Sequence, residues 1–168
     1  YTAKFAKKFN HKFVFAVKRY KYSKLYPTDL FKKEMNFFKR YMDKDNFEFL
    51  LENVNLKENR FSSYSAIFQS KVAVGTQSTL LRDKIGLGEK ILSCNLTGLK
   101  IQDFPLNGIC TINNCSYEQF EQRLNEIMNI SIEEYFNKID KDKNYVMEFK
   151  SSYGTIEAIK KGIDKIIN

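Results

Sequence analysis

The sequence predicts an α/β protein with an open, mostly parallel sheet that is flanked by helices. Short apolar runs of strand length alternate along the chain with amphipathic segments that begin at capping residues. The 168 residues, 43% of them hydrophobic, suffice for one sizeable core. Gly and Pro are scarce, at 7 and 2 residues, which excludes a fibrous or disordered composition. We therefore expect a single domain over residues 1–168 with about five strands.

The first elements come from the N-terminal third of the chain. Residues 12–17 are β-branched and aromatic without a breaker, which predicts a central strand buried on both faces. Pro27 lies in a loop, after which Thr28 or Asp29 caps a helix that extends to Met42. Residues 47–51 form a second candidate strand, and residues 53–59 form a polar linker.

The central part alternates helix and strand. Residues 62–70 predict a short helix that leads directly into a strand at residues 71–74. The next helix, residues 79–87, ends at Gly88, a typical C-terminal glycine. Further strands are expected at residues 90–94 and 108–112, with a turn over residues 95–98.

Two capping boxes mark the helices that follow. Ser116 with Gln119 opens a helix to about Asn129, and Ser131 with Glu134 opens another through Ile139. An amphipathic pattern over residues 155–167 predicts a last helix.

The net charge indicates the kind of partner to expect, and the cysteine content argues against a disulfide-rich or zinc-binding protein. The net charge of +8, concentrated towards the N-terminus, favours an acidic partner such as a nucleotide, a nucleic acid or an anionic membrane surface. Cys94, Cys110 and Cys115 lack the spacing of a disulfide framework or a metal site, so we expect no metal and a reducing cytoplasm. No apolar run approaches the roughly 20 residues of a membrane span. The chain starts at Tyr1 within an amphipathic stretch, and we expect it to be part of a longer protein.

The strongest functional signal is the turn after the strand at residues 71–74. Gly75, Thr76, Gln77, Ser78 and Thr79 lead from a strand into a helix, where free backbone amides and the helix dipole favour an anion such as a phosphate. The same residues also suit a tight turn with an ordinary helix cap, and local chemistry does not decide between these two interpretations.

Other polar residues are expected to join this turn at the carboxyl edge of the sheet. Lys18 and Arg19 follow the predicted first strand, and a cation pair beside a helix N-terminus would bind a diphosphate. Asp83, one turn into the helix, could accept hydrogen bonds from ribose hydroxyls or simply stabilise the helix dipole. His11 precedes the first strand and is expected at the surface.

The sequence from Ser62 to Asp83, followed by Gly88-Glu-Lys-Ile-Leu92, resembles the C-terminal domain of GT-B glycosyltransferases of bacterial surface-carbohydrate biosynthesis. In that group a helix precedes a V-G-x-x-S-T type turn, an acidic residue follows, and a G-K-K-V/I-L type strand comes next. The similarity is good to about Ser93 and weaker to Tyr117. The resemblance implies a Rossmann-like domain, one half of a GT-B fold, that holds a nucleotide sugar as substrate and needs no further cofactor.

By position, the resemblance implies that Gln77, Ser78 and Thr79 contact donor phosphates and that Asp83 contacts the ribose. It also implies a glycan acceptor bound through an N-terminal domain outside this chain, a cytoplasmic location including the inner face of the membrane with peripheral attachment to it, and products such as capsule or lipopolysaccharide. Two features depart from the family. Asp83 stands where Glu is usual, and Lys18-Arg19-Tyr20 stands where many members have a His-Pro pair.

Two alternatives to a donor-binding domain remain. Tyr20, Tyr22 and Tyr26 alternate with basic residues, as in a module that stacks nucleic-acid bases, although we expect no nucleic acid. A non-catalytic partner domain would also fit, because no acid, base or nucleophile constellation can be assembled and catalytic residues stay unknown. Sugar transfer by this chain alone is not expected.

Overall fold

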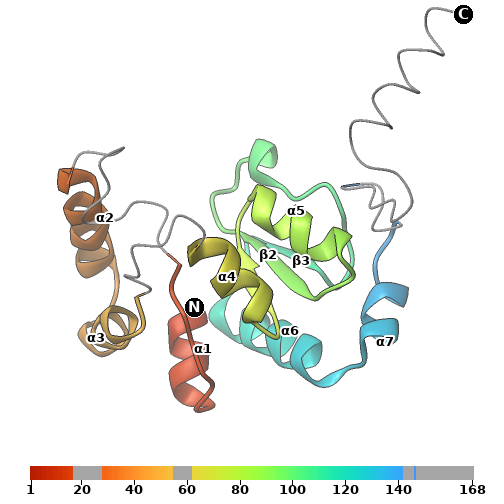
Figure 1. Cartoon of the computed structure of the whole chain (residues 1–168), viewed down its shortest axis with the longest axis horizontal. Helices are drawn as coiled ribbons and strands as arrows, with labels where there is room; N and C mark the ends of the chain where they lie inside the picture. Colours follow the sequence, from red (N-terminus) through yellow and green to blue (C-terminus); the bar gives the residue numbers. More distant parts are fainter. Residues whose placement is uncertain (17–27, 55–61, 142–145, 147–168) are drawn as a thin grey trace, which may run out of the picture.

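The computed structural model describes residues 1–16, 28–54, 62–141 and 146, and it confirms an α/β fold with a parallel sheet flanked by helices (Figure 1). The sheet has three strands in the order β1-β2-β3: β1 (Ala73–Gly75), β2 (Ile91–Asn95) and β3 (Thr111–Asn113). All pairs are parallel, with Ala73 opposite Ile91 and Ser93 opposite Thr111. Three of the expected strands are thus confirmed.

Helices α4 (Ser62–Gln69), α5 (Thr79–Gly86), α6 (Tyr117–Asn129) and α7 (Ile132–Asn137) surround the sheet, and a short 3-10 helix, η1 (Lys100–Gln102), follows β2. Their apolar sides and the strands form one core that includes Leu81, Ile91 and Phe120. Both predicted capping boxes are present at the starts of α6 and α7. These helices begin where the sequence predicts because each Ser side chain and its partner three residues on satisfy free amides of the first turn.

Two buried lysines cap the C-terminal ends of helices in this core by donating hydrogen bonds to free carbonyls. The Nζ of Lys84 donates to the carbonyls of Ile67 and Ser70 at the end of α4, at 2.9 Å each, and also binds Glu89. The Nζ of Lys90 donates to the carbonyls of Ile127, at 2.9 Å, and Ile130 at the end of α6. Burial lowers the pKa of Lys90, which the nearby Lys71 lowers further. An ammonium there satisfies carbonyls that lack a helical partner and complements the helix dipole.

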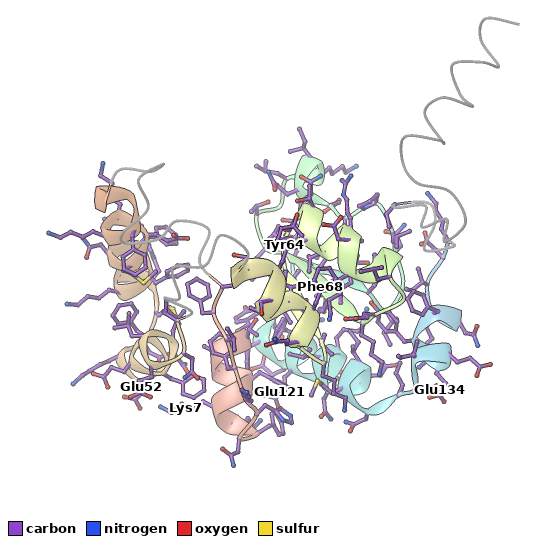
Figure 2. All side chains as sticks on the ribbon, in the orientation of Figure 1. Lys7, Glu52, Tyr64, Phe68, Glu121 and Glu134 are labelled. Carbon is purple, nitrogen blue, oxygen red and sulfur yellow. The ribbon has the colours of Figure 1, made fainter. Side chains whose placement is uncertain are left out.

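The remaining helices form a second, smaller core. Helix α2 (Thr28–Tyr41) packs on α3 (Lys44–Glu52) through Met35 and Leu50, and Phe15 and Phe38 cover them. Helix α1 (Thr2–Lys8) lies between this helix pair and the sheet (Figure 1). Figure 2 labels residues of these contacts: Lys7 binds Asp45 of α3, and the Nζ of Lys8 lies 2.5 Å from Glu121 of α6. Helix α1 therefore joins the two cores.

The predicted strand over residues 12–17 is wrong for its described part. Phe15 makes an isolated parallel bridge with Val54 and donates its amide to the carbonyl of Asn53 at 2.8 Å. Phe13 stacks on Phe49 at 5.8 Å between ring centroids, and Val14 is exposed. The segment is extended, but it packs one-sided on the helix pair rather than in the sheet. A short apolar run does not specify which surface will cover it.

The predicted strand over residues 47–51 is also wrong, because these residues belong to α3. The side chain of Asp43 accepts hydrogen bonds from the backbone amide of Asn46, at 2.9 Å, and from its Nδ2, at 2.7 Å. This cap starts a helix that buries Leu50 and leaves Leu51 exposed. We expected about five strands, and the described residues form a sheet of three. The last predicted helix, residues 155–167, and most of the predicted linker lie outside them.

Candidate functional site

The turn between β1 and α5 has the predicted form. Strand β1 ends at Gly75, whose added Cβ would lie 3.3 Å from the side chain of Leu81, so a small residue suits the close packing of strand and helix. Ser78 is the N-cap of α5, and its Oγ accepts from the amide of Leu80 at 3.3 Å. The capping interpretation of Ser78 is thus confirmed, while its hydroxyl hydrogen is still available to a ligand.

Hydrogen bonds to β2 fix this turn in place. The Oγ of Ser93 donates to the carbonyl of Thr76 at 3.1 Å, and the hydroxyl of Thr76 donates to the carbonyl of Cys94 at 3.3 Å. The amides of Leu81 and Arg82 both donate to the carbonyl of Ser78. The amide of Thr79, at the first helical position, has no acceptor within the described residues. A preformed turn with a spare amide is the arrangement that binds an anion.

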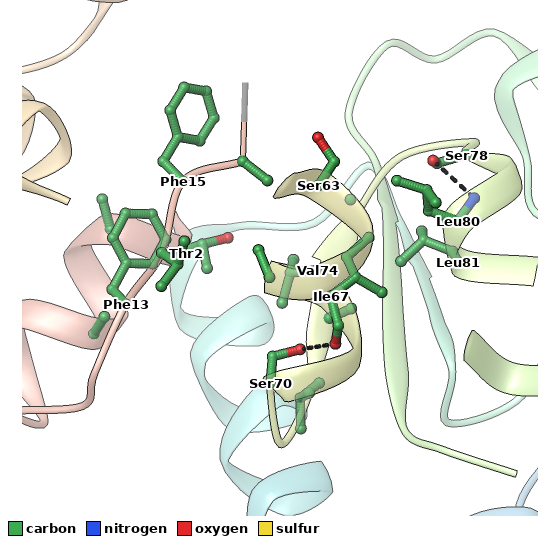
Figure 3. Close-up of a pocket in the computed structure, with 18 of the residues that line it drawn as sticks. Thr2, Phe13, Phe15, Ser63, Ile67, Ser70, Val74, Ser78, Leu80 and Leu81 are labelled. Atoms are coloured by element: carbon green, nitrogen blue, oxygen red, sulfur yellow. Dashed lines mark hydrogen bonds between the residues drawn. The ribbon is translucent and has the colours of Figure 1, made fainter. Parts of the chain in front are cut away.

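A large cavity of about 1440 Å³ adjoins the turn. It extends from α1 and the segment of residues 11–16, past α4, to β1 and the start of α5. Figure 3 shows Phe13 and Phe15 on one side of it and Ser63, Ile67 and Val74 on the other. Most of the lining is apolar, with hydroxyl and amide groups at the α5 end. The cavity is large enough for a nucleotide.

The structure separates the predicted site residues into three groups. Gly75, Gln77, Ser78 and Thr79 line the cavity. Thr76 and Asp83 do not line it. Lys18 and Arg19 lie outside the described residues, and the segment before them, residues 12–16, is not part of the sheet. Within the described strands, the order β1-β2-β3 contains no reversal, so the expectation of a strand-order switch point has no support there.

Sequence reasoning missed several cavity residues. Lys12 and Lys71 line the cavity and bring positive charge to it. The aromatic wall from Phe13 and Phe15 was also missed, because the sequence gives no sign that this segment faces α4 rather than joining the sheet. His11 also lines the cavity and, as expected, is exposed, with its ring stacked on Phe5 at 5.6 Å.

At the carboxyl end of β2, the polar side chain of Asn95 is bonded to the following loop and not to an open site. Buried Asn95 donates its Nδ2 to the carbonyl of Leu99, at 3.0 Å, and to Asp103, at 2.7 Å. Its Oδ1 accepts from the amide and the hydroxyl of Thr97 at 2.9 and 2.7 Å. All hydrogen-bonding positions of this amide are filled, so Asn95 organises the loop over residues 95–103 and is not a free ligand group.

The described residues offer little catalytic chemistry. No group of three His, Cys, Asp or Glu side chains among them could hold a metal ion. Burial raises the pKa of the Cys110 thiol to about 12, and burial together with the neighbouring Cys115 raises that of the Cys94 thiol to about 12, so neither is a thiolate at neutral pH.

The tyrosines of the nucleic-acid alternative, within residues 20–26, lie outside the described part. No helix in the described part is sufficiently long and apolar for a membrane span.

A family model described as "putative O-antigen biosynthesis protein" matches residues 4–161, nearly the whole chain. The chain belongs to this family. The family name links it to the biosynthesis of O antigen, a surface carbohydrate, in agreement with the coarser part of the resemblance found in the sequence. No curated protein matched the chain, and no solved structure matched it either.

Proposed function

We propose that this O-antigen biosynthesis family member binds a nucleotide sugar, with the diphosphate at the turn between β1 and α5. The observation that carries the proposal is the preformed helix start at Ser78 and Thr79, which opens onto a cavity of about 1440 Å³. The spare Thr79 amide, its exposed hydroxyl and the Ser78 hydroxyl supply donors for phosphate oxygens.

Charge around the cavity supports an anionic ligand. Lys12 and Lys71 line the cavity, and among the described residues no Asp or Glu does. The apolar wall that includes Phe13 and Phe15 gives a nucleobase or sugar a surface on which to pack. Asp83 does not line the cavity, so in the proposed pose it does not contact the ribose.

In this proposal the chain is the donor-binding part of a glycosyltransferase. It brings the nucleotide sugar to a glycan acceptor held by another domain, which also supplies the catalytic base. The chain alone then binds nucleoside diphosphates without transferring sugar. We assign the catalytic base to another domain because, among the described residues, no carboxylate lines the cavity beside the turn.

Calorimetric titration of the chain with UDP, GDP and dTDP tests the proposal, with the corresponding nucleosides as phosphate-free controls. At least one diphosphate should bind more tightly than its nucleoside. Replacing Thr79 by Val should weaken that binding by about 1–3 kcal/mol, the range for a lost hydrogen bond to a charged group. Thr111→Val is the matched control, because Thr111 lies in β3, outside both the turn and the cavity lining. Binding of an oligonucleotide in place of any diphosphate would favour the nucleic-acid alternative.

A further inference from the structure

Asn107 is followed by Gly108 in the segment that leads into β3, and both residues are exposed. It is the only Asn of the chain that precedes a Gly. Because Gly has no side chain to shield its backbone nitrogen, the Asn of such a pair is chemically labile. Asn107 is therefore the residue of this chain at which loss of a side-chain amide is most readily expected.

The reaction needs no partner except water. The backbone nitrogen of Gly108 attacks Cγ of Asn107, so that a bond between these two atoms forms. The bond from Cγ to Nδ2 breaks, and ammonia leaves with the proton of the Gly108 amide. Water then opens the resulting succinimide ring, which leaves aspartate or isoaspartate at position 107.

In the folded protein, hydrogen bonds hold Asn107 against Asp140, which follows α7. The Oδ1 of Asp140 accepts from the backbone amide of Asn107 at 2.7 Å, and the Oδ2 accepts from the Nδ2 of Asn107 at 2.9 Å. These two bonds lower the pKa of the Asp140 carboxyl, so the acceptor is charged at neutral pH. We name this pair of residues the Asn107–Asp140 clamp.

The backbone on the other side of the reacting bond is also held. Gly108 forms an isolated antiparallel bridge with Ile139, and the amide of Ile109 donates to the carbonyl of Lys138 at 3.0 Å. The Nη1 of Arg123 donates to the carbonyl of Gly108 at 2.9 Å. Ring closure brings Cγ of Asn107 onto the Gly108 nitrogen, and these contacts restrain both groups.

We propose that Asn107 is a deamidation site whose lifetime is set by Asp140, because Asn107 reacts only after the Asn107–Asp140 clamp opens. Local opening of this kind controls the access of a folded segment to slow chemistry. The product would place a second carboxylate where the Nδ2 of Asn107 now donates to Asp140. Two carboxylates in contact repel each other, so deamidation would release the end of α7 from the start of β3.

Peptide mass spectrometry of the folded chain, incubated at mildly alkaline pH, measures the conversion of Asn107 to aspartate and isoaspartate. A synthetic peptide of residues 104–112, which lacks the clamp, gives the reference rate. The folded chain should react at least roughly ten-fold more slowly than the peptide, since hydrogen bonds to a charged group must first break. Equal rates for the peptide and the folded chain would overturn the proposal.

Variants of Asp140 separate the clamp from the general stability of the fold. Asp140→Ala should recover most of the peptide's rate, and Asp140→Asn, which keeps an uncharged acceptor, should react at an intermediate rate. Lys84→Met removes hydrogen bonds at the end of α4, outside the clamp, and should react as slowly as the unmodified chain. If both Asp140 variants are as slow as the unmodified chain, Asp140 does not protect Asn107 and the proposal fails.

Asn107→Asp tests the effect of the product. It should lower the melting temperature of the chain because it sets two carboxylates against each other. Asn10→Asp is the control, since Asn10 is exposed and its side chain has no hydrogen bond among the described residues. Equal melting temperatures of these two variants would contradict the predicted release of α7.

Discussion

The hydroxyl of Tyr135 exchanges two hydrogen bonds with the backbone of Ile91. It donates to the Ile91 carbonyl at 2.8 Å and accepts from the Ile91 amide at 3.1 Å. Pairing of β2 with β3 begins only at Ser93, so a side chain from α7 completes the hydrogen bonding of the first residue of β2. Both residues are fully buried, and water cannot replace the hydroxyl.

Replacing Tyr135 by Phe should therefore destabilise the protein by about 1–3 kcal/mol, the cost of leaving buried polar groups unpaired. Urea unfolding of the variant measures this loss. Tyr64→Phe is the control, since the Tyr64 side chain is exposed and its loss of a hydroxyl should change the unfolding free energy little. Equal stabilities of the two variants would show that the Tyr135 hydroxyl contributes nothing.

Replacing Lys84 by Met should also cost about 1–3 kcal/mol, because the half-buried carbonyls of Ile67 and Ser70 would lose the buried ammonium that donates to them. Lys100→Met, at an exposed position in η1, should have an effect within about 0.5 kcal/mol of zero. Denaturant midpoints of both variants give the comparison. A Lys84 variant as stable as the unmodified chain would mean that water satisfies these carbonyls instead.

Two glycines with positive φ should respond differently to replacement by Ala. At Gly108, with φ +91°, the new Cβ would lie 2.1 Å from the Lys138 carbonyl oxygen, so the variant should fail to fold or lose most of its stability. At Gly98, with φ +73°, the nearest atom is 3.9 Å away, and the cost should be only the backbone strain of about 1–2 kcal/mol. Thermal unfolding ranks the two variants, and a Gly108 variant as stable as the Gly98 variant would contradict the described contact with α7.

Alkaline pH should destabilise the fold through Cys110. Burial raises the pKa of its thiol to about 12, whereas in the unfolded chain it ionises near its ordinary value of about 8.5. Between these values the unfolded state releases a proton that the folded state keeps, so stability falls as pH rises. Unfolding free energies measured from pH 8 to 10 should fall less steeply for Cys110→Ala, and identical slopes would contradict the burial of this thiol.

The elements that the sequence predicts best are those with local signals. Ser116 and Ser131 open helices because the residues three positions on complete capping boxes, and the turn at Gly75 follows from small residues after an apolar run. Asp43 also caps a helix, but the adjacent apolar run at residues 47–51 fits a strand equally well by composition, so α3 was missed.

Long-range partners explain what the sequence could not predict. Lys84 and Lys90 have the composition of surface residues, yet both are buried because distant helix ends offer carbonyls. The aromatic wall at Phe13 and Phe15 depends on α2 and α3, which lie far along the chain. The candidate site could thus be predicted at its turn but not at its opposite wall.

The most direct test of the proposed diphosphate site follows backbone amide resonances by NMR while UDP, GDP or dTDP is added. The proposal predicts that a binding diphosphate shifts the amides of Thr79 and Leu80 most, that neighbours at Gly75 to Ser78 shift less, and that the matching nucleoside leaves Thr79 unchanged. Millimolar diphosphate that leaves residues 75–81 unshifted, or that shifts only amides of α2, would contradict the site.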